Sequence, residues 1–359
     1  WNGMWQKPAS GKSIPVISPV TEEVLGEAPA ANKSDTRKVV ESAVSGTAQW
    51  RKVIAWERSR MLRRVAEVMK ERSDDMARWL SLELGKPLDQ SKGEVSMAIE
   101  QFEWYAEEAK RIYGHILESR QPHGKVLIQH EPIGVVAAFT SWNFPVVLAA
   151  RKIAPALAAG CSVILLPAEE APGSAMSLVQ CLHEAGVPAG VINLINGSAD
   201  TISPVLLNES RVRKISLTGS ARVGKLLIKA SAETLKRTSM ELGGHAPVII
   251  YADADAEAIA EQAALVKFKH CGQVCASPSR YFIHESQAEA FTNKFIEIAQ
   301  NFKLGNGMES GVDIGPLATK KRLKEVELMV SGTLKSGARL RLGGKRPERF
   351  DRGFFYEPT

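Results

Sequence analysis

Residues 133–166 read IGVVAAFTSWNFPVVLAARKIAPALAAGCSVILL, and this stretch decides the fold class. It opens a series of short apolar runs rich in Val and Ile, at 134–140, 161–166, 191–194 and 214–217. Helical stretches lie between the runs, at 147–159 and 172–185. Strands and helices that alternate in this way are typical of a parallel sheet covered by helices. The sequence therefore predicts an α/β protein.

A second α/β pattern begins near residue 246, and the segments before residue 133 differ from both halves. Strands are expected at 247–251 and 280–283, and helices at 255–269 and 286–303. Residues 116–132 are expected to form a hairpin, because two apolar runs flank a polar stretch that contains Pro122 and Gly124. Upstream, the capping-box pattern SKGE at 91–94 predicts that a helix begins there. We place the boundary between the two halves near 242–246.

Composition limits the class of protein. With 359 residues, 44% hydrophobic and 24% charged, the chain is typical of a globular protein with more than one domain. Its net charge of +6 is dispersed without a basic patch or motif, so no nucleic-acid partner is expected. No apolar run reaches the ~18 residues of a membrane span, and no secretory leader is visible. The 4 cysteines fit no disulfide framework or zinc ribbon, so we expect a cytoplasmic protein without a metal site.

Cys275, in the stretch GQVC at 272–275, is the first candidate for chemistry. Most free cysteines are buried core thiols. This one follows a helix and lies among Gly272, Ser277 and Pro278, which predicts a turn that can present the thiol to a cleft. A thiolate attacks carbonyl carbon well, but an unperturbed thiol is only slightly ionised at neutral pH. Its use as a nucleophile therefore requires a positive potential or a nearby base.

Glu241 and Asn143 carry side chains suited to general-base and oxyanion chemistry. Glu241 ends a strand-like stretch and precedes Gly243 and Gly244, which permit close backbone approach. It is either a solvated edge residue or a general base. Asn143 follows the strand at 134–140, at the edge where open α/β sheets bind ligands. It either caps the next helix or donates its amide hydrogen to a developing oxyanion.

A strand, a turn and a helix with small residues follow one another from residue 214. The turn and helix start read TGSARVG at 218–224. The first N–H groups of such a helix can hold a pyrophosphate. The stretch lacks the G-x-G-x-x-G spacing, and many αβ turns have this composition, so it is equally compatible with an ordinary turn.

Together these segments resemble the aldehyde dehydrogenase superfamily. The matching stretches are SWNFP at 141–145, LTGS at 217–220, ELGG at 241–244 and GQVC at 272–275. Their order fits the family, as do the 34 positions from Glu241 to Cys275, and the similarity extends over nearly the whole chain. The resemblance implies an aldehyde dehydrogenase-like α/β fold that forms a homodimer or homotetramer. It implies a Rossmann-type dinucleotide-binding domain at 1–115 and 133–241, an oligomerisation hairpin at 116–132 and an α/β catalytic domain at 242–359.

The resemblance also assigns roles. Cys275 is the implied nucleophile that forms a thioester with the aldehyde substrate, and Asn143 forms the oxyanion hole with the Cys275 backbone N–H. Glu241 activates the water that hydrolyses the thioester, and Lys152 supports this network. The hydride passes to a nicotinamide cofactor. The implied lining of the cofactor cleft is Ser141, Trp142, Glu169, Gly219, Ser220, Gly224, Leu242 and Gly243.

Three features depart from the family pattern. Leu166 stands where many members carry a lysine that holds the adenosine ribose. His270 and Cys271 replace a common Asn-Ala pair before Gly272. The chain also ends soon after Glu357, where a family member continues. That continuation supplies a glutamate for the nicotinamide ribose, substrate-pocket residues and a strand of the oligomerisation sheet, so 359 residues alone would be an incomplete enzyme.

The resemblance further suggests the cofactor and the substrate. Glu169 matches a glutamate on the adenosine ribose, and a carboxylate repels a 2′-phosphate. Because Leu166 replaces the lysine, we expect NAD rather than NADP, although Arg222 could reach a 2′-phosphate. Arg151 and Lys269 match positions where semialdehyde dehydrogenases bind the distal carboxylate of the substrate. Succinate semialdehyde, or a relative such as glutarate semialdehyde, is the expected substrate.

Other interpretations stay open. The chain could be a truncated, non-catalytic homologue, which only its early end supports. It could be an acylating dehydrogenase that transfers the acyl group to coenzyme A, although Glu241 favours hydrolysis. Arg151 and Lys269 could be surface charges, in which case the substrate is a neutral aldehyde.

Overall fold

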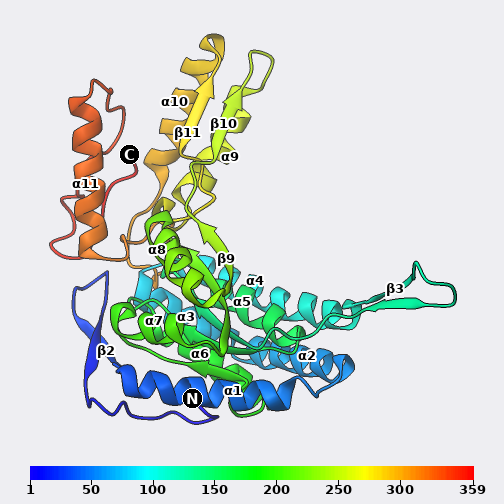
Figure 1. Ribbon diagram of the computed structural model, residues 1–359. Helices are drawn as coiled ribbons and strands as arrows, with labels where there is room; N and C mark the ends of the chain where they lie inside the picture. The colour runs from blue at the N-terminus through cyan, green and yellow to red at the C-terminus, as the bar shows by residue number, and fades with distance from the viewer. The chain divides into compact units, whose positions relative to one another are not determined.

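The computed structural model describes residues 1–359 and divides them into two compact units. The first unit contains residues 1–14, 28–73 and 94–241, and the second contains residues 15–27, 74–93 and 242–359. Figure 1 colours the chain from the blue N-terminus to the red C-terminus. No helix combines the length and the apolar character that crossing a bilayer would require.

A five-stranded sheet forms the centre of the first unit. Its strands lie in the order β7 (Ile192–Leu194), β6 (Ser162–Leu166), β5 (Val135–Phe139), β8 (Val212–Gly219) and β9 (Arg237–Leu242). The pairs β5–β6, β5–β8 and β6–β7 are parallel. Every residue of β5, β6 and β7 is buried, as in parallel sheets that are covered on both faces. The α/β fold expected from the apolar runs is confirmed.

Helices connect and cover these strands. They are α1 (Lys33–Trp50), α2 (Ala55–Glu71), α4 (Leu88–Glu108), α5 (Pro145–Ala158), α6 (Pro172–Glu184), α7 (Ala199–Asn208) and α8 (Ala221–Ser231). Proline occupies the first position of α5 and α6, where its missing N–H costs no hydrogen bond. A capping box starts α1, since Asn32 accepts from the Asp35 N–H while Asp35 accepts from the Asn32 N–H. The buried Trp50 indole at the other end of α1 donates to the Leu157 carbonyl at 2.8 Å.

The helix start predicted at 91–94 is wrong. Helix α4 begins at Leu88, directly after Pro87, whose fixed φ suits the residue that precedes a helix start. Ser91 therefore lies inside α4, where its hydroxyl pairs with that of Ser81 at 2.9 Å. The Glu94 carboxylate accepts hydrogen bonds from the start of α5. The SKGE stretch has the composition of a capping box, but its Glu94 carboxylate caps α5 rather than α4.

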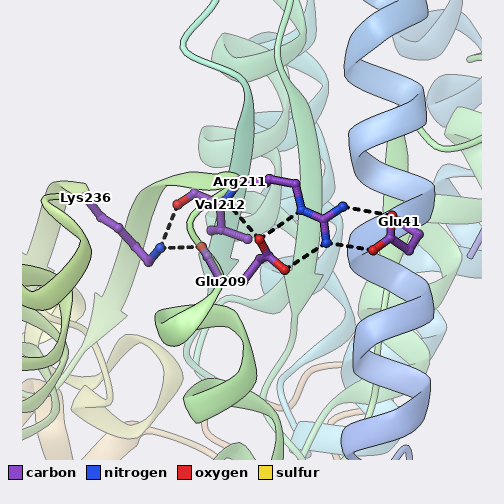
Figure 2. Close-up of polar contacts among 5 residues, drawn as sticks. All are labelled: Glu41, Glu209, Arg211, Val212 and Lys236. Atoms are coloured by element: carbon purple, nitrogen blue, oxygen red, sulfur yellow. Dashed lines mark hydrogen bonds and ion pairs between the residues drawn. The ribbon is translucent and has the colours of Figure 1, made fainter.

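A charge cluster fixes the N-terminal end of β8 (Figure 2). The Arg211 guanidinium contacts both Glu41 oxygens, at 2.9 and 2.6 Å, and reaches Glu209 at 2.9 and 2.8 Å. The Lys236 ammonium donates to the carbonyl oxygens of Glu209 and Val212 at 2.6 and 2.8 Å. The cluster ties β8 to α1 and to the segment before β9, within the first unit.

The expected hairpin is present. Strands β3 (His115–Glu118) and β4 (Lys125–Ile128) pair antiparallel, and all their residues are exposed. Ile116 and Leu127, which pair with each other, expose 72% and 62% of their surface. An isolated two-stranded ribbon has no core of its own, so its role in oligomerisation stays a prediction.

The second unit has a smaller sheet, in which β10 (Pro247–Ile250) and β11 (Arg280–Ile283) are parallel. One face of this sheet packs on α9 (Ala256–Phe268) and α10 (Glu285–Asn301). Ile250, Ala260 and Phe291 form part of this core. The remaining elements that contribute to this unit are α3 (Ser73–Leu84), the start of α4 at residues 88–93, η3 (Lys269–Gly272), α11 (Lys320–Lys335), and parts of the paired strands β1 (Ser13–Ile17) and β2 (Val24–Pro29).

Residues 15–27 and 74–93 belong to this second unit, although the sequence analysis assigned them to the first domain. Close backbone packing explains the difference. A Cβ atom on Gly307 would lie 2.3 Å from the Lys86 carbonyl oxygen, and one on Gly315 would lie 1.9 Å from that of Gly85. Only glycine permits this approach, and it holds the 85–86 backbone against residues 307–315.

Candidate active site

The carboxyl ends of three neighbouring strands form one edge of the first unit's sheet. Phe139 of β5 pairs with Leu166 of β6 and with Leu217 of β8, so the three strands end side by side. The segments that follow carry six of the predicted cofactor or oxyanion residues, namely Ser141, Trp142, Asn143, Glu169, Gly219 and Ser220. Open α/β sheets bind ligands at this edge.

Asn143 lies in the bend between β5 and α5, and a buried carboxylate fixes the helix that follows. No side chain of the bend caps α5, whose N-cap is Phe144. Instead the fully buried Glu94 accepts from the N–H groups of Val146 and Val147, at 2.9 and 3.3 Å. Helix N-termini stabilise negative charge. Glu94 therefore holds the start of α5 next to Asn143, a role that the sequence analysis missed.

Lys152 and Glu241 lie within electrostatic reach of each other. Lys152 is buried on α5, and its ammonium donates to the Ser216 hydroxyl on β8 at 3.1 Å. Burial lowers the pKa of Lys152 to about 8, and the attraction of the Glu241 carboxylate opposes that shift. Glu241 itself is exposed near the end of β9. The Lys152 cation on α5 thus attracts the candidate general base Glu241, and the Ser216 hydroxyl holds the cation in place.

The start of α8 offers unpaired N–H groups. Ser220 is the N-cap, and its hydroxyl accepts from the Val223 N–H at 3.3 Å. The N–H of the buried Gly224 donates to the Ser220 carbonyl at 2.9 Å. The N–H groups of Ala221 and Arg222 have no acceptor within the chain. Such a helix N-terminus fits a phosphate group, so these residues suit the pyrophosphate of a dinucleotide.

The remaining cofactor candidates lie at strand ends. Glu169 is exposed in the turn after β6, while Leu166 is buried at the end of β6. Leu242 is half-buried as the last residue of β9, and no atom lies within 4 Å of the point where a Gly243 Cβ would stand. The carboxylate at Glu169 is therefore accessible, and no cation stands at position 166.

Cys275 lies in a turn after the short helix η3 (Lys269–Gly272), as its neighbours predicted. It is the only exposed thiol of the chain. Its backbone N–H has no acceptor in the chain, as an oxyanion donor requires. Gly244 packs against this turn, since a Cβ atom there would lie 3.8 Å from the Cys275 carbonyl oxygen.

The other thiols are unsuited to nucleophilic attack. Cys161 and Cys181 are buried in the first unit. Burial raises the pKa of Cys181 and of Cys271 to about 12. The Cys271 thiol donates to the Gly315 carbonyl at 3.0 Å and so points into the unit's interior. At neutral pH the Cys181 and Cys271 thiols stay protonated, and a thiol is a far weaker nucleophile than a thiolate.

Arg151 and Lys269, the two cations predicted to bind a substrate carboxylate, are both exposed. Arg151 lies on α5 in the first unit, and Lys269 begins η3 in the second. Neither side chain forms a hydrogen bond or an ion pair with the rest of the chain. Both charges are therefore available to an anionic group.

Comparison with known proteins identifies the class. The model of the aldehyde dehydrogenase family matches residues 5–359. A glutarate-semialdehyde dehydrogenase of Pseudomonas putida is 41% identical, over 100% of this chain and 74% of the relative. An NADP(+) succinate-semialdehyde dehydrogenase of Escherichia coli is 40% identical, over 100% of this chain and 74% of the relative. A Staphylococcus aureus betaine aldehyde dehydrogenase solved with NAD+ has a TM-score of 0.97 at 32% identity, over 100% of this chain and 72% of that one.

The chain therefore belongs to the aldehyde dehydrogenase family, and the resemblance seen in its motifs is confirmed. Its class is that of oxidoreductases that act on aldehydes. Among the relatives, the Escherichia coli enzyme carries NADP(+) in its name, and the Staphylococcus aureus structure holds NAD+. The relatives therefore do not decide between the two nucleotides.

Proposed function

We propose that this protein oxidises a semialdehyde to the dicarboxylate with a nicotinamide dinucleotide, through a thioester on Cys275. The observation that carries the proposal is the turn of Cys275, whose thiol is the only exposed one and whose backbone N–H is unpaired. A nucleophile and an oxyanion donor on the same residue suit acyl chemistry. The family membership supports the same reaction.

Each step has a candidate residue. The Cys275 thiolate forms a carbon–sulfur bond with the aldehyde carbon, and the oxygen that becomes negative accepts from the Cys275 N–H and the Asn143 amide. A bound nicotinamide supplies the hydride acceptor that converts the adduct to a thioester. The Glu241 carboxylate then takes a proton from water as that water attacks the thioester carbon. Breaking the carbon–sulfur bond releases the acid and restores the thiolate.

We assign Lys152 the role of supporting Glu241. The buried Lys152 ammonium attracts the Glu241 carboxylate and so restrains the side chain that takes a proton from water. The hydrogen bond to Ser216 keeps the ammonium in place. Lys152 therefore positions the proposed base without contacting the substrate.

For the nucleotide, we propose a preference for NAD over NADP. The start of α8 accommodates the pyrophosphate, and the accessible Glu169 carboxylate repels a 2′-phosphate. Leu166 is apolar and buried, so it offers no compensating charge. The opposing candidate is Arg222, at the second position of α8. Comparable kcat/KM values for NAD and NADP would overturn the preference.

For the substrate, we propose succinate semialdehyde or a close relative such as glutarate semialdehyde. The exposed Arg151 and Lys269 can each pair with a distal carboxylate, Arg151 in a bidentate manner. Two of the relatives carry the names of enzymes for these substrates. A neutral aldehyde would leave both cations unused.

The experiment that tests the chemistry compares two cysteine variants in an NADH absorbance assay. Cys275→Ala removes the only exposed thiol and is expected to abolish turnover, because no other group can form the thioester. Cys271→Ala is the matched control, because its thiol is buried, protonated and turned inward. It should retain most of the activity. Near-normal turnover of Cys275→Ala would refute the mechanism.

The substrate assignment has a separate test. Arg151→Met keeps an unbranched side chain but removes its charge and its hydrogen-bond donors. We expect at least about a tenfold rise in KM for succinate semialdehyde, because charge-assisted hydrogen bonds contribute roughly 1.5–3 kcal/mol. The KM for an uncharged aldehyde of similar length should stay unchanged. Equal weakening of both substrates would leave only the general aldehyde dehydrogenase assignment.

A further inference from the structure

The backbone that leads to Cys275 is left-handed over three consecutive residues and strained at the two that are not glycine. His270, Cys271 and Gly272 all have positive φ angles, of 47°, 56° and 72°. Glycine adopts this left-handed conformation without penalty, but in other residues the Cβ atom crowds the following carbonyl oxygen. Such conformations persist only where the surrounding structure holds them, and they cluster at functional sites. We refer to residues 270–272 as the left-handed turn.

Gln90, 180 positions earlier in the chain, holds the first residue of the left-handed turn. Its side-chain carbonyl accepts from the His270 N–H at 2.9 Å, while its amide group donates to the Asp313 carbonyl at 2.9 Å. Since one end must accept and the other must donate, only one orientation of the amide satisfies both partners. Gln90 is thus a rigid link between the left-handed turn and residue 313.

The other side of the turn is closed by Gln273. Its backbone N–H and its side-chain amide both donate to the His270 carbonyl, at 3.0 and 3.2 Å. Its side-chain oxygen accepts from the Ala318 N–H at 3.2 Å. The N–H and the carbonyl of His270 are therefore each bound by a glutamine side chain. Both glutamines are anchored in turn to the segment 313–318.

The imidazole of His270 adds to this restraint. It is fully buried, and its pKa is lowered well below the usual value by burial and by the nearby Lys86 cation. Histidine is one of the few non-glycine residue types enriched in left-handed backbone. A buried ring at the first position of the turn prevents the segment from relaxing toward solvent.

We propose that Gln90 is a positioning residue for Cys275: by holding the N–H of His270 it keeps the left-handed turn in the geometry that presents the thiol and the N–H of Cys275. The proposal rests on Cys275 as the nucleophile. All the residues involved belong to the second unit. Loss of the link lets the turn relax, which moves the thiol and the oxyanion donor together, because they belong to one residue.

The test compares Gln90→Leu, which removes the acceptor at similar volume, with Gln90→Glu, which keeps an acceptor for the His270 N–H. Gln90→Leu should lower kcat about tenfold with an unchanged KM for the nucleotide, since a small displacement of reacting groups costs rate rather than nucleotide binding. The rate of Cys275 alkylation by iodoacetamide, measured without nucleotide, should fall at least about threefold. Gln90→Glu keeps the acceptor for the His270 N–H but loses the donor to the Asp313 carbonyl, so it should recover part of both losses.

Gln287→Ala is the matched control. Gln287 is also a second-unit glutamine whose amide donates to a distant backbone carbonyl, that of Ala252 at 2.7 Å, and it has no contact with the left-handed turn. This variant should keep the wild-type kcat and alkylation rate. If Gln90→Leu behaves like Gln287→Ala, the positioning role is refuted. In that case Cys275→Ala would still be inactive, which separates this failure from failure of the proposed mechanism.

A double variant keeps the test decisive if Gln90→Leu does not fold. His270→Gly removes the penalty of the left-handed conformation at the residue that Gln90 holds. Gln90→Leu combined with His270→Gly should therefore regain folded protein and a Cys275 alkylation rate within about threefold of His270→Gly alone. A double variant as defective as Gln90→Leu would contradict the proposal.

Discussion

The sheet edge of the first unit and the left-handed turn of the second unit position candidate residues in opposite ways. At the sheet edge, β5 and β6 are buried along their whole length and end in register. The strands therefore hold the residues that follow them in fixed positions. The left-handed turn has no such frame, because the nearby β10 and β11 form only a two-stranded sheet. It is held by side chains from far along the sequence.

This difference has a consequence for mutational sensitivity. A residue at the end of a buried strand stays in place when one neighbouring hydrogen bond is lost, because many backbone bonds fix the strand. A strained turn stays in place only while its restraints are intact. Substitutions around Cys275 should therefore change rates more than comparable substitutions in the scaffold of the sheet. Gln90→Leu tests the turn, and the following experiments measure the response of the first unit, in order of decreasing effect.

Asn143→Ala should produce the largest effect at the sheet edge. Removal of one oxyanion donor typically costs about 10²–10³ in kcat. The backbone should not move, because Glu94 holds the start of α5 independently of Asn143. Steady-state kinetics together with an unchanged melting temperature would show that the loss is chemical. A loss below about fivefold would mean that the Cys275 N–H acts alone.

Glu241→Gln should separate the two halves of the reaction. Formation of the thioester does not need the carboxylate, whereas hydrolysis does. Stopped-flow absorbance should record a full NADH burst, followed by a steady state slowed at least about tenfold. If the burst disappears as well, Glu241 acts before hydride transfer and its assignment as the water-activating base is wrong.

The pH dependence of hydrolysis should report on Lys152. Its pKa is lowered to about 8, so its charge is present below that pH and is lost as pH rises through about 8. Loss of the charge removes the attraction that holds the Glu241 carboxylate in place, and the steady-state rate should decline several-fold above about pH 8. Lys152→Met should be slow at all pH values and lack this inflection. An inflection that survives in Lys152→Met must come from another group.

The smallest effect is expected from the charge cluster of Figure 2, which belongs to the scaffold. Arg211→Met should lower the melting temperature by only about 2 °C at neutral pH and leave kcat unchanged, since exposed ion pairs contribute little. Hydrogen bonding from Arg211 lowers the pKa of Glu209 to about 2. The stabilisation is therefore present above the unfolded pKa of ~4.3 and disappears as pH falls toward 2. Melting curves of the two proteins should converge over that range.

The contrast between the two regions also explains which parts of the fold and of the candidate site could be predicted from the sequence. The strands at the sheet edge are visible in the sequence, because burial on both faces requires a continuous apolar run. The turn of Cys275 is visible too, since glycine, serine and proline gather around it. Glu94 was misassigned, because a carboxylate three residues after a serine has the same composition whether it caps its own helix or one 52 positions away.

The sequence by itself determined the α/β class, the hairpin, the exposed turn of Cys275 and the family. These features depend on local periodicity and on short motifs, which a single chain displays directly. Only the tertiary structure decided that Glu94 caps α5, that Lys152 donates to Ser216 and that Gln90 holds the N–H of His270. Each of these contacts joins segments far apart in the chain. Residue type alone does not specify which backbone group a polar side chain will meet once the chain has folded.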